Sequence, residues 1–208
     1  MTALLAAALA YLVGSIPFAV VVSRAMGLPD PRSFGSGNPG ATNVLRSGSK
    51  LAAILTLAGD ALKGWLPVWV AIRLDLGELV VAVVVVAAFL GHVFSVWLRF
   101  KGGKGVATAA GAILAADWRV GAAALVAWLG VAVATRYSSL ASIVGAIVAP
   151  AAVWGWRGFG PLFVATCVLC AVLVWRHEGN IRKLLRGEES RIGEKKAATC
   201  PRLPPPPR

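Results

Sequence analysis

The chain is interrupted, between two long apolar runs, by Gly35-Ser36-Gly37-Asn38-Pro39-Gly40-Ala41-Thr42-Asn43-Val44-Leu45-Arg46. Its glycines and Pro39 disfavour a regular helix, because glycine loses backbone entropy and proline removes a donor. The stretch offers backbone N–H groups, short hydroxyl and amide side chains, and the guanidinium of Arg46. Such a loop suits an anion, since successive amide dipoles converge on one point and arginine grips two oxygens at once. An ordinary turn-rich connector is the alternative.

The chain around this stretch has the composition of a membrane protein. Of its 208 residues, 58% are hydrophobic and 14% are charged, which is too apolar for an ordinary soluble domain. The apolar residues form long blocks rather than amphipathic stripes. We therefore expect an all-α membrane protein, a polytopic bundle of about seven transmembrane helices. The blocks are 3–23, 51–72, 79–98, 105–116, 120–135, 138–156 and 159–175.

The lengths of these blocks test that expectation. At about 1.5 Å per residue, each of the first three spans about 30 Å, enough to cross the hydrocarbon core of a bilayer. Block 105–116 is short, at about 18 Å, so residues 105–135 form either a tight hairpin or one kinked span. The first block lacks a basic leader and a cleavage signature, so we expect a retained span.

The basic residues indicate how the bundle is oriented. With seven crossings, seventeen of the 21 Lys and Arg residues fall on the side of the loops that follow blocks one, three, five and seven. The other four are Lys63, inside a block, and Arg73, Arg119 and Arg157. The positive-inside bias then places the rich side in the cytoplasm and the N-terminus outside. One crossing fewer would separate Arg136 and the C-terminal tail from Lys101 and Lys104, which favours seven.

Composition also limits the partners. The net charge is +12, and the Lys and Arg residues cluster between the apolar blocks. We therefore expect anionic substrates and membrane lipid as partners, and no nucleic acid. Cys167 and Cys170 form a lone C-x-x-C inside a block, where packing is expected rather than a metal or redox site. Asp60 and Lys63 lie inside the second block and are expected to neutralise one another rather than contact substrate.

The chain reads as one domain with a tail. Residues 1–193 are expected to form a single integral membrane domain. Residues 194–208 are basic and rich in proline, and such a segment cannot bury enough surface to offset its ordering entropy. We expect a disordered cytoplasmic tail.

A second polar stretch, residues 91–108, resembles the first in character. Gly102 and Gly103 allow close backbone approach, while Lys101 and Lys104 supply point charges. A helix is expected to start directly after them, so its free N–H groups would point to the same place. The stretch is not a P-loop, because a glycine follows the second lysine. A basic membrane-surface loop is the alternative.

Two further polar stretches lie on the same predicted face. Residues 176–188 carry His177 and Asn180, which would share one face of a helix; an amphipathic interfacial helix is the alternative. Residues 135–142 form a short polar turn. Its polar side chains include Arg136, Ser139 and Ser142. Four such stretches on one face predict a pocket for a phosphate-bearing substrate.

At these residues the chain resembles a family, the bacterial integral-membrane glycerol-3-phosphate acyltransferases that take their acyl group from acyl phosphate. The three cytoplasmic motifs of that family are matched by residues 36–43, by Gly91-His92 with residues 101–108, and by His177 with Asn180-Ile181. The flanking matches are Gly14-Ser15-Ile16-Pro17, Asp60 with Lys63-Gly64, and Arg136 with Ser139-Leu140 and Ser142. The similarity runs from about residue 11 to Glu188. Ser95 departs from it, since the family usually has proline there.

The resemblance implies an activity. A long acyl chain would pass from acyl phosphate to the sn-1 hydroxyl of glycerol 3-phosphate, giving lysophosphatidic acid and phosphate in the first step of phospholipid synthesis. It implies the bacterial cytoplasmic membrane, no cofactor, no metal, and neither coenzyme A nor acyl carrier protein as donor. The H-x-x-x-x-D pattern of other glycerolipid acyltransferases is absent, since Trp97 and Arg182 stand five positions after His92 and His177.

The resemblance also implies roles for the residues that match. Attack on an acyl phosphate passes through an oxyanion and expels phosphate, so donors and cations must be preset around both. Expected at the donor phosphate or oxyanion are Lys104 and the amides of Gly102 and Gly103. Expected at the glycerol phosphate are Ser36, Arg46 and Ser142. His177 and Asn180 would orient the acceptor hydroxyl, with either His177 or the leaving phosphate as base.

The expected site residues form two groups. The catalytic residues are Ser36, Lys104, His177 and Asn180. The substrate-binding residues are Gly37, Asn38, Thr42, Asn43, Arg46, Lys101, Gly102, Gly103, Arg136, Ser139 and Ser142.

Two other classes of protein share some of these features. A transporter or channel for an organic phosphate is compatible with the charges inside the second block. Its site would lie near the midplane between repeats, however, and no repeat is visible. A structural protein whose basic face only holds anionic lipid would tolerate changes at Gly102, Gly103 and Asn38.

Overall fold

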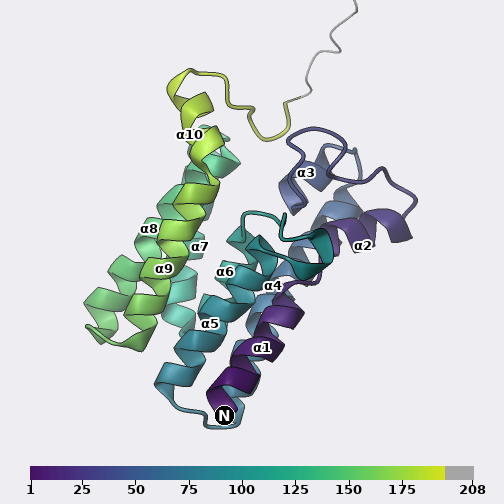
Figure 1. Cartoon of the computed structure of the whole chain (residues 1–208). Helices are drawn as coiled ribbons and strands as arrows, with labels where there is room; N and C mark the ends of the chain where they lie inside the picture. The colour runs from purple at the N-terminus through teal and green to yellow at the C-terminus, as the bar shows by residue number, and fades with distance from the viewer. Residues whose placement is uncertain (195–208) are drawn as a thin grey trace, which may run out of the picture.

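A computed structural model describes residues 1–194 of the chain (Figure 1). The predicted tail, residues 194–208, lies outside the described residues except for Glu194. The described part folds into ten α-helices and one 3₁₀ helix. They are α1 (Thr2–Gly14), α2 (Phe18–Ala25), α3 (Ala41–Leu45), α4 (Lys50–Arg73), α5 (Glu78–Val93), η1 (Val96–Leu98), α6 (Val106–Ala116), α7 (Trp118–Thr135), α8 (Ser138–Arg157), α9 (Pro161–Arg176) and α10 (Glu178–Leu185).

Each predicted apolar block contains at least one helix in the structure. Five segments within residues 1–194 are long and apolar enough to cross a membrane, and a sixth is added if α9 and α10, bent by 58°, count as one. The five are Thr2–Ala25, α4, Glu78–Leu98, α7 and α8. The prediction of an all-helical membrane protein is confirmed. Helix α6, with 11 residues, is only about 16 Å long.

The apolar pattern of the first block predicts one continuous helix, but the structure has two. The block divides into α1 and α2 around Pro17, because proline has no N–H to donate and its ring opposes the preceding turn. The carbonyl oxygens freed at the break find partners inside the bundle. Lys63 Nζ donates to Ile16 O at 2.6 Å, and Ser95 Oγ donates to Ser15 O at 2.6 Å. Such internal partners are required where backbone is irregular at membrane depth.

Residues 105–135 form a hairpin of two helices. Helix α6 begins beside Lys104 and ends at Asp117, whose Oδ2 lies 3.6 Å from Arg157 Nη1 at the far end of the bundle. Helix α7 returns to the first end, where Arg136 Nη2 donates to Ile192 O at 2.8 Å. The alternative of one kinked span is therefore wrong.

Glycine brings α4 and α6 into backbone contact. A Cβ atom on Gly64 would lie 2.1 Å from Thr108 O, and one on Gly111 would lie 2.0 Å from Ala61 O. Only glycine permits such an approach, which is typical of small-residue packing between membrane helices. This contact fixes the start of α6, and with it the position of Lys104.

The charges inside the second block pair with one another, as predicted. Lys63 Nζ lies 2.6 Å from Asp60 Oδ1, and both side chains are buried. His92 of α5 adds a third member, with Nδ1 3.5 Å from the same oxygen. A buried charge needs such a partner, so this group belongs to the framework of the bundle.

Candidate functional site

The predicted polar stretches meet at one end of the bundle, the upper end in Figure 1. Lys104, just before α6, donates through Nζ to Asn180 Oδ1 of α10. Arg176, at the end of α9, donates to Gly102 O at 3.1 Å. The second and third stretches thus lie in direct contact, although more than seventy residues separate them.

The first and fourth stretches also touch. Thr42 Oγ1 of α3 lies 3.3 Å from Ser138 Oγ, at the start of α8. Ser142 Oγ donates to Ser138 O at 2.7 Å and accepts from Trp128 Nε1 at 3.2 Å. Ser142 is therefore buried beneath this contact, with its hydroxyl engaged by α7 and α8.

Lys104 is the partly buried cation of the group. Burial, which has the largest effect, and the positive charges of Arg176, Lys183 and Arg46 together lower its pKa to about 8, against the opposing effect of the carboxylate of Glu189. At neutral pH the ammonium is still largely protonated. A desolvated ammonium of this kind binds an anion more strongly than an exposed one does.

His177 lies past the end of α9, at its junction with α10. Its Nδ1 lies 2.8 Å from Leu173 O. Because a carbonyl oxygen only accepts, Nδ1 carries the proton and Nε2 is left as an acceptor. Burial, then the charge of Lys104, lowers the pKa of His177 to about 4. The imidazole is thus neutral at pH 7 and able to accept a hydrogen bond or a proton.

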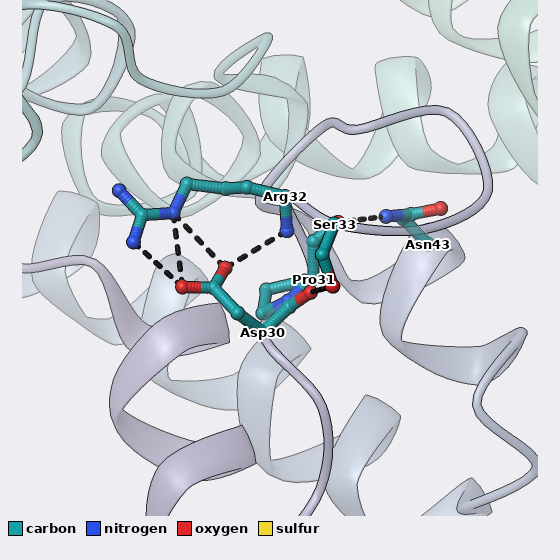
Figure 2. Close-up of polar contacts among 5 residues, drawn as sticks. All are labelled: Asp30, Pro31, Arg32, Ser33 and Asn43. Atoms are coloured by element: carbon teal, nitrogen blue, oxygen red, sulfur yellow. Dashed lines mark hydrogen bonds and ion pairs between the residues drawn. The ribbon is translucent and has the colours of Figure 1, made fainter.

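Asn43 shapes the loop that carries Ser36. Its Nδ2 donates to Pro31 O at 2.6 Å and to Phe34 O at 3.2 Å, while its Oδ1 accepts from Ser36 N at 2.9 Å. Figure 2 shows the bond from Asn43 to Pro31 beside the Asp30–Arg32 ion pair at the start of the loop. Predicted to bind substrate, Asn43 lies buried under the loop with its amide engaged by backbone.

The loop itself lies at the surface. Ser36 and Gly37 are exposed, and Gly37 adopts a positive φ of 67°, which favours glycine. Ser36 Oγ accepts from Asn38 N at 3.4 Å. Lys101, in the second stretch, is exposed as well. These groups are accessible to a ligand at this end of the bundle.

The backbone amides of Gly102 and Gly103 have partners within the chain. The sequence predicts that the amides of Gly102 and Gly103 hold an anion. In the structure Gly102 N donates to Val93 O at 3.1 Å and Gly103 N donates to His92 O at 3.2 Å. Both amides are hydrogen-bonded to backbone oxygens at the end of α5, so they are not free to hold an anion in this conformation. Close approach is what the glycines provide, since a Cβ on Gly102 would lie 2.0 Å from His92 O.

The remaining predicted side chains contact the segment that follows α10. Arg46 Nη2 donates to Ser190 Oγ at 2.7 Å, and Arg136 donates to Ile192 O. Ser139 Oγ donates to Glu189 at 2.6 Å. Basic and hydroxyl groups of the first and fourth stretches are thereby gathered under residues 189–192.

Glu189 is the residue that sequence reasoning missed. Its Oε1 accepts from both Asn180 Nδ2 and Ser139 Oγ, each at 2.6 Å. The third stretch ends one residue earlier, where apolar periodicity stops. The available signal was an acidic residue directly after a strongly basic helix.

A cavity of about 230 Å³ lies at the other end of the bundle. It is lined by residues that include Glu78 and Arg157, which form an ion pair at 3.3 Å. We do not assign the reaction to it, because these polar groups already neutralise one another and the four polar stretches lie at the opposite end. Within residues 1–194 no group of three or more His, Cys, Asp or Glu residues is placed to hold a metal ion.

Comparison with known proteins identifies the family. The family model described as glycerol-3-phosphate acyltransferase matches residues 4–187. The chain belongs to the glycerol-3-phosphate acyltransferase family. Glycerol-3-phosphate acyltransferases of Paraburkholderia phytofirmans and Paraburkholderia xenovorans are each 58% identical to it over 207 residues, covering 97% of this chain and 96% of theirs.

Solved structures of the same family share the fold. One is PlsY (YgiH), described as an integral membrane glycerol 3-phosphate acyltransferase, in its glycerol 3-phosphate form, with a TM-score of 0.88 and 38% identity. Its lysophosphatidic acid form gives a TM-score of 0.86 and 37% identity, and both matches cover 93% of this chain and 96% of theirs. The predicted resemblance, acyltransferase activity and integral-membrane location are confirmed, and the transporter and lipid-binding alternatives fall away. The roles of individual residues stay predictions.

Proposed function

We propose that this glycerol-3-phosphate acyltransferase moves a fatty acyl group from acyl phosphate to the sn-1 hydroxyl of glycerol 3-phosphate. The observation that carries the proposal is the contact between Lys104 and Asn180, with Arg46 and Arg176 close enough to act on the same ammonium. Two phosphorylated substrates need such a concentration of positive charge. Related structures in glycerol 3-phosphate and lysophosphatidic acid forms support the acceptor and the product.

The proposed reaction is a direct displacement at the acyl carbon. The sn-1 oxygen forms the new ester bond while the bond from the carbonyl carbon to the phosphate oxygen breaks, which releases inorganic phosphate. Lys104 stabilises the negative charge that develops on the oxyanion or the leaving phosphate. The hydroxyl proton passes to the leaving phosphate or to Nε2 of His177, which is free to accept it.

The proposed setting is the bacterial cytoplasmic membrane. Seven crossings would place the N-terminus outside and the Lys104 end in the cytoplasm, with residues 1–193 as one domain and membrane lipid around it. Nucleic acid is not a proposed partner. The proposal is supported by charge at the far end of the bundle, where Asp117 pairs with Arg119 at 3.1 Å and with Arg157 at 3.6 Å. Compensated arginines on the outer face agree with the positive-inside rule.

A donor-specific assay tests the proposal. Purified protein in detergent or lipid cubic phase should release phosphate from palmitoyl phosphate only when glycerol 3-phosphate is present. The matched control is Lys104→Ala, which should lower turnover at least about 10²-fold, as for loss of a preset oxyanion donor. Acyl transfer from palmitoyl-CoA but not from palmitoyl phosphate would overturn the donor assignment.

A further inference from the structure

Glu189 stands where two predicted site residues from distant elements meet. Ser139 lies in the first turn of α8 and Asn180 in the first turn of α10, and both donate to the same carboxylate oxygen. Because a carboxylate only accepts, it orders both donors at once. Hydrogen bonds to a charged acceptor are also stronger than those between neutral groups.

The two-sided contact of Asn180 gives this carboxylate a specific effect. Asn180 Oδ1 accepts from Lys104 Nζ, while its Nδ2 donates to Glu189 Oε1 at 2.6 Å. An ammonium only donates and a carboxylate only accepts, so one orientation of the amide satisfies both. Without Glu189 only the bond from Lys104 would orient the amide, so its position would be less firmly fixed.

The carboxylate also balances charge at Lys104. The charged groups that act on this ammonium are Glu189, Arg176, Lys183 and Arg46. Glu189 supplies the negative charge among them and raises the pKa of Lys104, against the effects of burial and of the three cations. Removing that charge would favour loss of the lysine proton.

Neighbouring contacts hold Glu189 in place. Ser190 Oγ accepts from Arg46, and Ile192 O accepts from Arg136. Arg191 lies over the ring of Tyr137, with its guanidinium carbon 5.5 Å from the ring centroid. Figure 1 shows this segment leaving α10 and crossing the end of the bundle toward α3. Contacts to the end of α3 and to the turn between α7 and α8 fix its path over the site.

We propose that Glu189 is a positioning residue for acyl transfer, which turns Asn180 toward Lys104 and ties Ser139 to the same point. It does not touch the reacting atoms; it acts through the side chains that do. This inference rests on the proposed function only for the identity of the acceptor, glycerol 3-phosphate.

The test compares Glu189→Gln with Glu188→Gln in the full-length protein. Glycerol 3-phosphate binding is measured by calorimetry from pH 6 to 10 alongside turnover of palmitoyl phosphate. Glu189→Gln should weaken binding at pH 7 about tenfold, the effect of losing a hydrogen bond to a charged group. Its loss of affinity at high pH should also begin at lower pH than in the natural protein. Glu188 is exposed and precedes Glu189 in the chain. Glu188→Gln removes the same charge without breaking these contacts, so its affinity and pH dependence should stay close to those of the natural protein.

Glu189→Asp separates contact from charge. It keeps the negative charge on a shorter arm, so its pH dependence should match that of the natural protein while binding at pH 7 is weaker. Thermal unfolding of each variant confirms that it is folded. Equal affinity of Glu189→Asp and the natural protein, or an unshifted pH dependence in Glu189→Gln, would overturn the inference. Binding without turnover in the natural protein would instead contradict the proposed donor and leave this comparison intact.

Discussion

Lys104 carries two opposing demands. A buried ammonium must keep its proton to hold a phosphate, yet burial lowers its pKa to about 8. Its titration therefore falls just above neutral pH. If Lys104 holds a substrate phosphate, as proposed, the protonated form is the form that binds.

The pH dependence of the reaction follows from this sign. Since the protonated form binds, kcat/KM for glycerol 3-phosphate should fall as pH rises through about 8, and that parameter reports the free enzyme. Lys104→Arg should remove the fall up to pH 10, because a guanidinium stays charged. Its kcat/KM at pH 7 should be lower than that of the natural protein, since a planar fork replaces a compact charge. Initial rates of phosphate release across the pH range measure both, and an unchanged fall in Lys104→Arg would assign the titration to another group.

For some residues the amino-acid type predicted the position in the structure, and for others it did not. Lys104 and Asn180 were expected in the site, and the structure brings them into contact. Asn43 was expected there too, but its amide is used to hold the Ser36 loop. Both outcomes suit an asparagine, because the same donor and acceptor serve a ligand or a backbone equally well. Glu189 was not predicted, because a carboxylate is not expected to bind an anion.

At the scale of helices, apolar patterning predicted location and not continuity. Helix α4 lies within one residue of its block, and α6 does as well. The break at Pro17 and the end of α5 at Val93 were not predicted. The backbone oxygens of Ile16 and Ser15 accept hydrogen bonds from Lys63 and Ser95, which lie in distant segments of the chain. Such tertiary partners leave no trace in a local pattern. Ser95, where the family usually has proline, supplies a donor that proline lacks.

The α4–α6 contact yields a prediction at this scale. Gly111→Ala would place a methyl group 2.0 Å from Ala61 O, so the two helices must separate. Overpacking of this kind costs about 1–3 kcal/mol, and it would also displace the start of α6 beside Lys104. We expect a lower unfolding temperature in detergent and weaker glycerol 3-phosphate binding.

Gly130→Ala is the matched control for that change. Gly130 lies in α7, and a Cβ atom there would meet nothing within 4 Å. Replacing an open helical glycine by alanine should be neutral or stabilise by up to about 1 kcal/mol. Equal unfolding temperatures for the two variants would contradict the close packing of α4 on α6.

The whole molecule has chemically different ends. The end with Lys104 gathers loops that are rich in Lys and Arg, while the far end pairs Arg119 and Arg157 with Asp117. Helix α4, with 24 residues, is about 36 Å long and joins the two. Its ends should therefore face opposite sides of the membrane, and the charge difference should set which is which.

Cysteine labelling tests this orientation. In a variant with all three cysteines replaced, Lys50→Cys and Asp75→Cys mark the two ends of α4, both at exposed positions. In right-side-out vesicles an impermeant maleimide should label Asp75→Cys directly and Lys50→Cys only after permeabilisation. Turnover of the cysteine-free protein shows that it is folded. Direct labelling of Lys50→Cys alone would invert the orientation. Direct labelling of both would mean that α4 does not cross the membrane. Lys104 and the neighbouring cations would then not lie on the cytoplasmic face, where the proposed reaction needs them to bind two phosphorylated substrates.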